Sequence, residues 1–129
     1  MATLQVNGGR AIVTSRIKGL GTEPLNIGWG TGAGVTAATD TTLFSEVLVT
    51  GAAGGTDHTA GTSSQVTTTT ASDTYQVTGT RTATGAVAVT NMGLFDAASG
   101  GNLYIKGDFA VVNLAIGDSI ALTAKIQYS

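Results

Sequence analysis

The sequence contains no cysteine among its 129 residues and a single proline, Pro24. Disulfides therefore cannot reinforce the fold, and thiolate ligands for a metal are excluded. Aromatic residues are only 5% of the chain, and much of the 42% hydrophobic fraction is alanine, so the core is expected to be thin. Glycine occurs 19 times, which raises the conformational entropy lost on folding. We therefore expect association with other copies, or with a larger surface, to supply part of the stability.

Charged side chains are also scarce, and the formal net charge is −2. The six basic residues are dispersed and form no stripe, so nucleic acid is not an expected partner; they are Arg10, Arg16, Lys18, Arg81, Lys106 and Lys125. No apolar run approaches the roughly 20 residues of a membrane helix, and the start MATLQVNGGR does not resemble a signal peptide. We expect a chain made in the cytosol, with no membrane partner.

The length fits one domain, with residues 1–24 forming an N-terminal arm and a short helix and residues 25–129 a β-sandwich domain. The arm, Met1–Val6, is expected to add a strand through Leu4 and Val6. Arg10–Lys18 lacks the clean alternation of a strand, although Ile, Val and Thr make a helix weak there. We favour a short helix, capped by Asn7 and ended by Gly19. Its expected buried residues are Ile12, Val13, Ile17 and Leu20.

Alternating apolar residues predict strands for most of the remaining chain. The clearest is Ser119–Ser129, preceded by the apolar run Phe109–Ile116; Gly117-Asp118 between them predicts a hairpin. On the inner face of the last strand we expect Ile120, Leu122, Ala124, Ile126 and Tyr128. The other expected strands lie at 25–29, near 43–49, twice within 65–84 with a hinge at Ser72-Asp73, at 86–95 and at 102–106. Between the last two, the turn residues Asp96–Gly101 are expected to reverse the chain. The total of about eight strands predicts an antiparallel sandwich or barrel.

Two glycine-rich stretches are expected to form loops. Gly51–Ser64 is expected to be long and mobile. Gly30–Asp40 follows Gly28 and Trp29 to give GWGTGAG, which invites comparison with a phosphate-binding loop. However, there is no GxGxxG pattern, no following Lys-Ser or Lys-Thr, and no strong helix start. These glycines therefore indicate a close turn or backbone packing against a neighbour.

No motif predicts a reactive centre. The sole histidine, His58, follows Asp57, but neither a cysteine nor a second histidine could complete a site, so we expect an exposed loop histidine. No GxSxG motif activates a serine. Calcium binding by Asp96 and Asp108 lacks a suitable ligand spacing. The carboxylates are scattered and are expected to cap turns and solvate edges: Glu23, Asp40, Glu46, Asp57, Asp73, Asp96, Asp108 and Asp118. The sequence thus predicts no catalytic residue, no cofactor and no metal.

The aromatic residues are expected mainly in the core. Those within or beside apolar strand segments are Trp29, Phe44, Phe95, Tyr104 and Phe109. Tyr75 and Tyr128 are expected to be partly exposed. A sugar-binding platform would need several exposed aromatic rings together.

Three segments resemble tailed-bacteriophage structural proteins, and together they cover most of residues 25–129. Ile27–Glu46 (IGWGTGAGVTAATDTTLFSE) has a strand, a GxG loop, a small-residue stretch, Asp-Thr-x-Leu and a nearby Glu. Val89–Asp96 (VTNMGLFD), followed by Gly100–Leu103 (GGNL), resembles a phage pattern T-E-x-G-L-F-D…G-G-x-L. Gly117–Ser129 (GDSIALTAKIQYS) resembles the ending of the same group. Asn91 stands where the phage pattern has an acidic residue. A salt bridge made by the acidic residue in the phage proteins is therefore not implied for this chain.

This resemblance implies a small capsid decoration (cement) protein: a jelly-roll-like antiparallel β-sandwich that forms a homotrimer. It would bind the outer surface of the virion head, between subunits of the major capsid protein. Similar patterns occur in tail-fibre and tail-collar proteins, so a tail-fibre or receptor-binding module is the alternative. Fibre modules usually sit on longer chains, whereas this sequence runs from Met1 to Ser129 with nothing appended. A glycan hydrolase is the third interpretation and would need two carboxylates across a cleft.

The expected contact residues follow from expected exposure. Capsid contacts are expected on the arm and on the 30–40 loop, at Met1, Ala2, Thr3, Leu4, Gln5, Val6, Gly30, Thr31 and Gly32. Contacts within the trimer are expected on the strands near Tyr75 and Tyr128.

Overall fold

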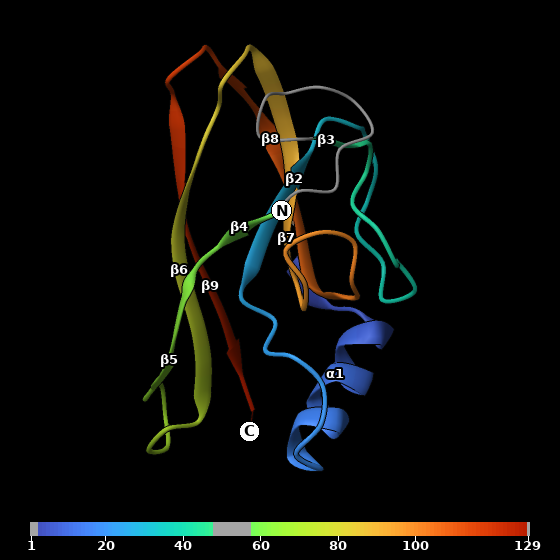
Figure 1. Ribbon diagram of the computed structural model, residues 1–129, viewed down its shortest axis with the longest axis vertical. Coiled ribbons are helices and arrows are strands. Elements are labelled where there is room, and N and C mark those ends of the chain that lie inside the picture. The colour runs from blue at the N-terminus through green and yellow to red at the C-terminus, as the bar shows by residue number, and fades with distance from the viewer. Residues whose placement is uncertain (1–2, 48–57, 129) are drawn as a thin grey trace.

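The computed structural model describes residues 3–47 and 58–128, which form two antiparallel sheets and one short N-terminal helix (Figure 1). The elements are β1 Thr3–Gln5, α1 Asn7–Ile17, β2 Asn26–Gly30, β3 Glu46–Val47, β4 Thr59–Ala60, β5 Thr62–Val66, β6 Thr74–Thr82, β7 Val87–Phe95, β8 Leu103–Leu114 and β9 Ser119–Gln127. The expected mainly β class is confirmed. Among these residues, α1 has 11 residues, and no helix is long and apolar enough to cross a membrane.

The larger sheet has six strands, in the order β1-β8-β7-β2-β3, with β4 pairing with β2. Its longest ladder is the antiparallel β7–β8 pair, which confirms the chain reversal expected between residues 95 and 102. The two strands expected at 102–106 and 109–116 are wrong, because β8 runs without a break from Leu103 to Leu114. The Asp96 carboxylate accepts a hydrogen bond from the Asn102 backbone N–H at 2.6 Å. Gly100 and Gly101 take positive φ angles of 65° and 80°, which residues with a Cβ rarely adopt. Glycine therefore allows this turn to close.

The smaller sheet has the order β5-β6-β9. β5 and β6 form the hairpin expected with its hinge at Ser72-Asp73, and Ser72 has a positive φ of 57°. The Asp73 carboxylate accepts hydrogen bonds from the backbone N–H groups of Thr68, Thr69 and Thr70. These bonds hold the pKa of Asp73 far below its ordinary value. Asp73 therefore organises the loop, and the Ser72 N–H adds a bond to the Thr67 hydroxyl.

The hairpin expected between residues 109–116 and 119–129 is wrong. A turn does occur at Gly117-Asp118, but β8 pairs with β7 and β1 in one sheet, whereas β9 pairs with β6 in the other. The Gly117 N–H donates to the Ala83 carbonyl, and the Ala83 N–H donates to the Asp118 carbonyl, at 2.8 Å each. These bonds direct the chain onto β6, so the turn crosses between sheets. Alternation identified the strands but could not identify their partners.

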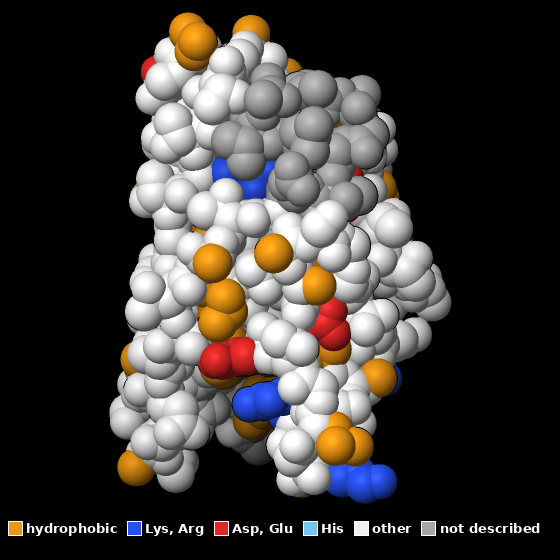
Figure 2. Space-filling view, viewed as in Figure 1, with side chains coloured by type: hydrophobic (Ala, Val, Ile, Leu, Met, Phe, Trp, Pro, Cys, Tyr) orange, Lys and Arg blue, Asp and Glu red, His pale blue; other side chains and the backbone are white. Residues whose placement is uncertain are grey.

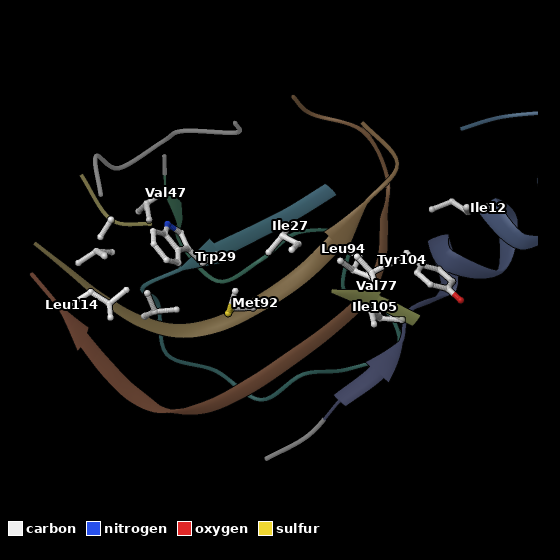
Figure 3. Packing of buried hydrophobic residues seen from close by; sticks show 13 residues of the cluster. Ile12, Ile27, Trp29, Val47, Val77, Met92, Leu94, Tyr104, Ile105 and Leu114 are labelled. Atoms are coloured by element: carbon white, nitrogen blue, oxygen red, sulfur yellow. The ribbon is translucent and has the colours of Figure 1, made fainter. Parts of the chain in front are cut away.

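One hydrophobic cluster holds residues of both sheets, and Figure 3 shows its side chains from close by. Trp29 on β2 is fully buried, as expected, and shares the cluster with Leu94 on β7, Tyr104 on β8 and Val77 on β6. On β9, the expected inner face is confirmed because Ile120, Leu122, Ala124 and Ile126 alternate with exposed residues. Those inner side chains are nevertheless only half-buried, which fits the expected thin core.

The N-terminal arm belongs to the larger sheet, because β1 pairs with β8. The helix begins at Asn7, so Asn7 is not its cap; Val6 is the N-cap residue and makes no side-chain cap bond. Ile12 is buried and Val13 half-buried, but Ile17 is 81% exposed and Leu20 56% exposed, contrary to expectation. The helix contacts β8 only through its first turns, as Gly9 and Ile12 are its buried residues. Gly19 does follow its end, with φ 85°.

The loop expected at residues 51–64 is partly wrong. Residues 51–57 lie outside the described part. From Thr59 onwards the chain instead forms β4 and β5, which join different sheets. The strand expected near 43–49 is described only at Glu46–Val47. The β-branched residues Thr59, Thr62 and Val66 suit strands, and pairing with β2 and β6 supplies the backbone partners that local sequence does not reveal.

Candidate functional site

The described residues of the N-terminal arm are only partly exposed to solvent. Thr3 and Leu4 are exposed, Gln5 is half-buried and Val6 is completely buried. The Val6 N–H donates to the Tyr104 carbonyl at 3.1 Å, which extends the pairing of β1 with β8. Met1 and Ala2 lie outside the described residues. Among the described residues of the expected capsid-contact set on the arm, Thr3 and Leu4 are therefore the exposed ones.

The glycines of the 30–40 loop lie against Phe44. Gly30 is buried, and a Cβ there would overlap the Phe44 carbonyl oxygen; a Cβ on Gly34 would lie 2.7 Å from the Phe44 ring. Backbone bonds join Thr31 to Ser45 and Gly32 to Phe44. The sequence interpretation of these glycines as backbone packing is thus confirmed. Gly30 is not accessible, while Thr31 and Gly32 are half-buried.

Asn91 fixes this loop to β7. Its buried side chain accepts a hydrogen bond from the Phe44 N–H at 2.9 Å and donates to the Phe44 carbonyl at 3.1 Å. The neighbouring Thr90 hydroxyl donates to the Gly32 carbonyl. The amide therefore uses both a donor and an acceptor, a combination that an ionised acid cannot supply.

Two carboxylates hold the far part of the loop. The Lys106 ammonium, whose side chain is fully buried, lies 2.9 Å from Asp40 Oδ2 and 3.2 Å from the centroid of the Phe44 ring. The hydrogen bond from Lys106 lowers the pKa of Asp40. Asp108 accepts a bond from the Thr36 N–H at 3.1 Å, and bonding to Thr36 lowers its pKa. Because these residues anchor the loop, its exposed apolar contact point is Val35, at 79% exposure.

Three tyrosines gather beside α1. Tyr75, Tyr104 and Tyr128 line a cavity of about 430 Å³ together with Ile12, Val13, Arg16, Ile17, Glu23 and Pro24. Figure 2 shows the surface hollowed between the helix and the three-stranded sheet, with apolar and charged side chains around the hollow. The Tyr104 and Tyr128 hydroxyls are 2.7 Å apart, and the Tyr75 hydroxyl donates to Glu23 Oε1 at 3.2 Å. Burial raises the pKa of Tyr75 and Tyr104, so both hydroxyls remain protonated.

The aromatic expectations hold in outline. Trp29, Phe95 and Tyr104 are buried, whereas Phe44 and Phe109 are half-buried. Tyr75 is half-buried and Tyr128 is 46% exposed, as expected for partly exposed residues. The sequence did not reveal that Tyr104 joins them at one cavity, because the three residues come from different strand segments.

The expectation of an exposed histidine is wrong. The His58 side chain is fully buried and stacks on Phe95, with ring centroids 4.0 Å apart. Its Nδ1 lies 2.8 Å from the Ala97 carbonyl and its Nε2 lies 2.5 Å from Glu46 Oε1. The glycine-rich sequence before His58 predicted a loop with an exposed side chain. The pairing of β4 with β2 instead places His58 against the β7–β8 turn. His58 is therefore a structural link between β3, β4 and that turn.

The described residues contain no group of three metal-binding side chains. Asp108 lies opposite Asn91 in the β7–β8 ladder, whereas Asp96 lies beyond the other end of β7, so the two do not form a shared site. Asp73, Asp96 and Asp118 each accept backbone N–H bonds within turns, which confirms their expected capping role. The described surface offers exposed apolar side chains at Leu4 and Val35, the tyrosine cavity and the edges of the smaller sheet.

The chain matches no protein-family model, no curated protein and no solved structure.

Proposed function

We propose that this protein is a bacteriophage capsid decoration protein that binds the outside of the head as a homotrimer and has no catalytic role. Its partners would be the major capsid protein and other copies of itself. The observation that carries the proposal is where the phage-like segments lie. They build β2 with its packed loop, β7 with the following turn, and β9. The segments that resemble virion proteins thus form the framework and its edges, as a structural protein requires.

Clamping would work through many modest contacts. Leu4 and Val35 are exposed apolar side chains on the two elements expected to face the capsid, and each lies on backbone fixed by hydrogen bonds. One such contact is weak, but three copies joined together raise the effective concentration of each contact. The assembled cap would then hold neighbouring capsid subunits together.

We also infer a jelly-roll-like topology. The chain crosses from the larger to the smaller sheet between β4 and β5, returns between β6 and β7, and crosses again between β8 and β9. Repeated crossing between two antiparallel sheets is typical of that architecture. An experimental chain trace of the whole protein, including residues 48–57, tests this assignment.

Sedimentation with empty heads tests the function. The protein should co-sediment with heads and saturate at a fixed number of copies. Leu4→Asp and Val35→Asp should each weaken binding at least tenfold, because a carboxylate would be desolvated at an apolar contact. Ile116→Asp is the matched control, since Ile116 is 76% exposed and belongs to neither element. Failure of the wild-type protein to sediment with heads would refute the proposal.

The tyrosine cavity favours a second candidate, a receptor-binding module of the phage tail. Aromatic rings beside Arg16 and Glu23 offer both stacking and hydrogen bonds to a glycan. Binding to purified host-surface glycans, lost in Tyr128→Ala without loss of folding, would support this candidate. Binding to heads without any glycan binding would favour decoration.

A further inference from the structure

The two sheets differ in how their edges are protected. The larger sheet ends on β1 and β3, which have three and two residues, although β1 pairs only with Ile105–Gly107 and leaves residues 108–114 of β8 with β7 as their one described strand partner. Short edge strands are a common protection against pairing with other chains. The smaller sheet ends instead on β5 and β9, with five and nine residues, and within residues 3–47 and 58–128 each pairs only with β6. Two long backbone edges are thus open on one sheet.

These edges also lack the charges that usually guard a free strand. Lys125 is the one charged residue on β9, and β5 has none. On the inner side, half-buried apolar residues reach the β9 edge, where a cavity of about 250 Å³ opens between β9 and the β1–β8 side of the sandwich. Its apolar lining includes Met92, Leu94, Ile105, Phe109, Leu122 and Ala124, and its charged lining residues are Lys106, which pairs with Asp40, and Lys125. Depletion of charge beside incompletely covered apolar residues is typical of a protein interface.

The strand directions indicate which partner fits. β5 and β9 are both antiparallel to β6, so they run parallel to each other. Rotation of a copy about an axis parallel to these strands leaves their direction unchanged. It therefore brings β5 of the next copy alongside β9 of the first in a parallel orientation. A cyclic assembly needs two different edges on opposite sides of the molecule, and this sheet supplies both.

We propose that β9 of one copy pairs with β5 of the next, so that the smaller sheets close into a ring of three. A second copy fits better than an unrelated strand because ring closure covers both open edges at once, whereas a single added strand would leave β5 open. The pairing places no like charges opposite each other, since Lys125 meets an uncharged strand. This inference rests on the proposed homotrimer and identifies its contact.

The test uses charge substitutions on one face of the sheet. Thr62, Thr78 and Thr123 form one cross-strand row, and all three are exposed. The first variant carries lysine on both edges: Thr62→Lys, Ser64→Lys, Ala121→Lys and Thr123→Lys. The second carries Thr62→Glu and Ser64→Glu with the same two lysines on β9. Ala11→Lys with Thr14→Lys is the control for added charge, because both residues are exposed on α1, outside the smaller sheet.

Sedimentation equilibrium without capsids gives the readout. The wild-type protein and the control should have three times the 12.8 kDa monomer mass. The lysine-lysine variant should fall threefold in mass, because like charges meet across each contact. The lysine-glutamate variant should remain trimeric at low salt and dissociate at high salt. If both variants become monomeric, opposite charges on β9 and β5 do not restore assembly and the proposed contact is wrong; if both stay trimeric, the edges are not the interface.

A measurement on the unmodified chain covers the case in which a variant does not fold. On dilution below the assembly concentration, hydrogen exchange should quicken in β5 and β9 together. Unchanged exchange, or a wild-type monomer at every concentration, would overturn the inference. Head binding is measured separately: a trimer that ignores heads would refute decoration but leave the β9–β5 contact standing.

Discussion

Asn91 is the residue on which the packing of the 30–40 loop depends most directly. It is fully buried and bonds to both the N–H and the carbonyl of Phe44. Asn91→Asp should lower the free energy of unfolding by about 2 kcal/mol, because the new carboxylate would face the Phe44 carbonyl without a donor. Urea unfolding monitored by Trp29 fluorescence measures the loss.

Asn113→Asp provides the control for this substitution, since Asn113 is exposed on the neighbouring strand β8. It should change the free energy of unfolding by no more than about 0.5 kcal/mol. Equal urea midpoints for the two variants would show that the Asn91 amide does not anchor the loop.

Single residues also mark the limit of what sequence reveals. Trp29 could be assigned to the core because its size and strand context agree. His58 could not be assigned to the core, because its burial depends on two partners. Phe95 is far from it in the sequence, and Glu46 is separated from it by a glycine-rich stretch. Lone polar residues carry no periodicity, so their partners become visible only in the fold.

At the scale of elements, the β5–β6 loop links stability to pH through Asp73. Its pKa is lowered in the folded state by the backbone bonds of residues 68–70, from an ordinary value of 3.8. The stabilisation is therefore present above 3.8 and is lost as the pH falls towards the folded value. Asp73→Asn should flatten the fall in stability between about pH 4 and pH 2. Thermal unfolding across that range checks this, and identical slopes for the two proteins would contradict it.

The contact of α1 with β8 reverses the usual effect of a glycine substitution. Alanine normally stabilises a helix by about 1 kcal/mol relative to glycine. At Gly9, however, a Cβ would overlap the Tyr104 carbonyl oxygen and lie 3.0 Å from its ring. Gly9→Ala should therefore destabilise the protein by roughly 1–3 kcal/mol in urea unfolding. Arg10→Ala, at an exposed neighbour, should be nearly neutral; a stabilised Gly9→Ala would show that α1 can move off β8 at no cost.

Elements with strong local signals were predictable from the sequence. Alternation identified β6, β7 and β9, and turn residues identified the β5–β6 and β7–β8 hairpins, but β8 was divided into two strands because Gly107 and Asp108 resemble a break in the pattern. The pairing of β9 with β6 was not predictable, because an alternating strand fits many neighbours and the choice depends on bonds at Ala83. The exposure of Ile17 was not predicted for a similar reason. The spacing of apolar residues indicates which face of a helix is buried, but not how far the sheet beneath that face extends.

At the scale of the whole molecule, Arg81 joins the two sheets. It projects from β6 and is fully buried, donating to the Ile27 carbonyl at 2.9 Å and the Val47 carbonyl at 3.4 Å across the sandwich. Its guanidinium also lies 4.9 Å from the Trp29 ring centroid. Arg81→Met should cost about 3 kcal/mol of stability, since buried carbonyls would lose charged donors.

Arg10→Met, the same change at an exposed arginine on α1, is the reference for Arg81→Met. Chemical denaturation of both variants compares them. Equal stability of the two variants would mean that the sheets are held together by apolar packing alone.

The proposed contacts at this scale were only partly accessible from the sequence. The arm and the 30–40 loop could be named, but Val6 and Gly30 proved buried, because β1 pairs with β8 and the loop folds onto Phe44. The open edges of β5 and β9 could not be foreseen, since an edge exists only once the sheet order is known.

The most direct measurement of the proposed function is an image of the mature particle at a resolution that traces this chain. The account predicts copies in groups of three on the outer surface of the head, with Leu4 and Val35 towards the major capsid protein. A head surface without this chain, or copies confined to the tail, would contradict it.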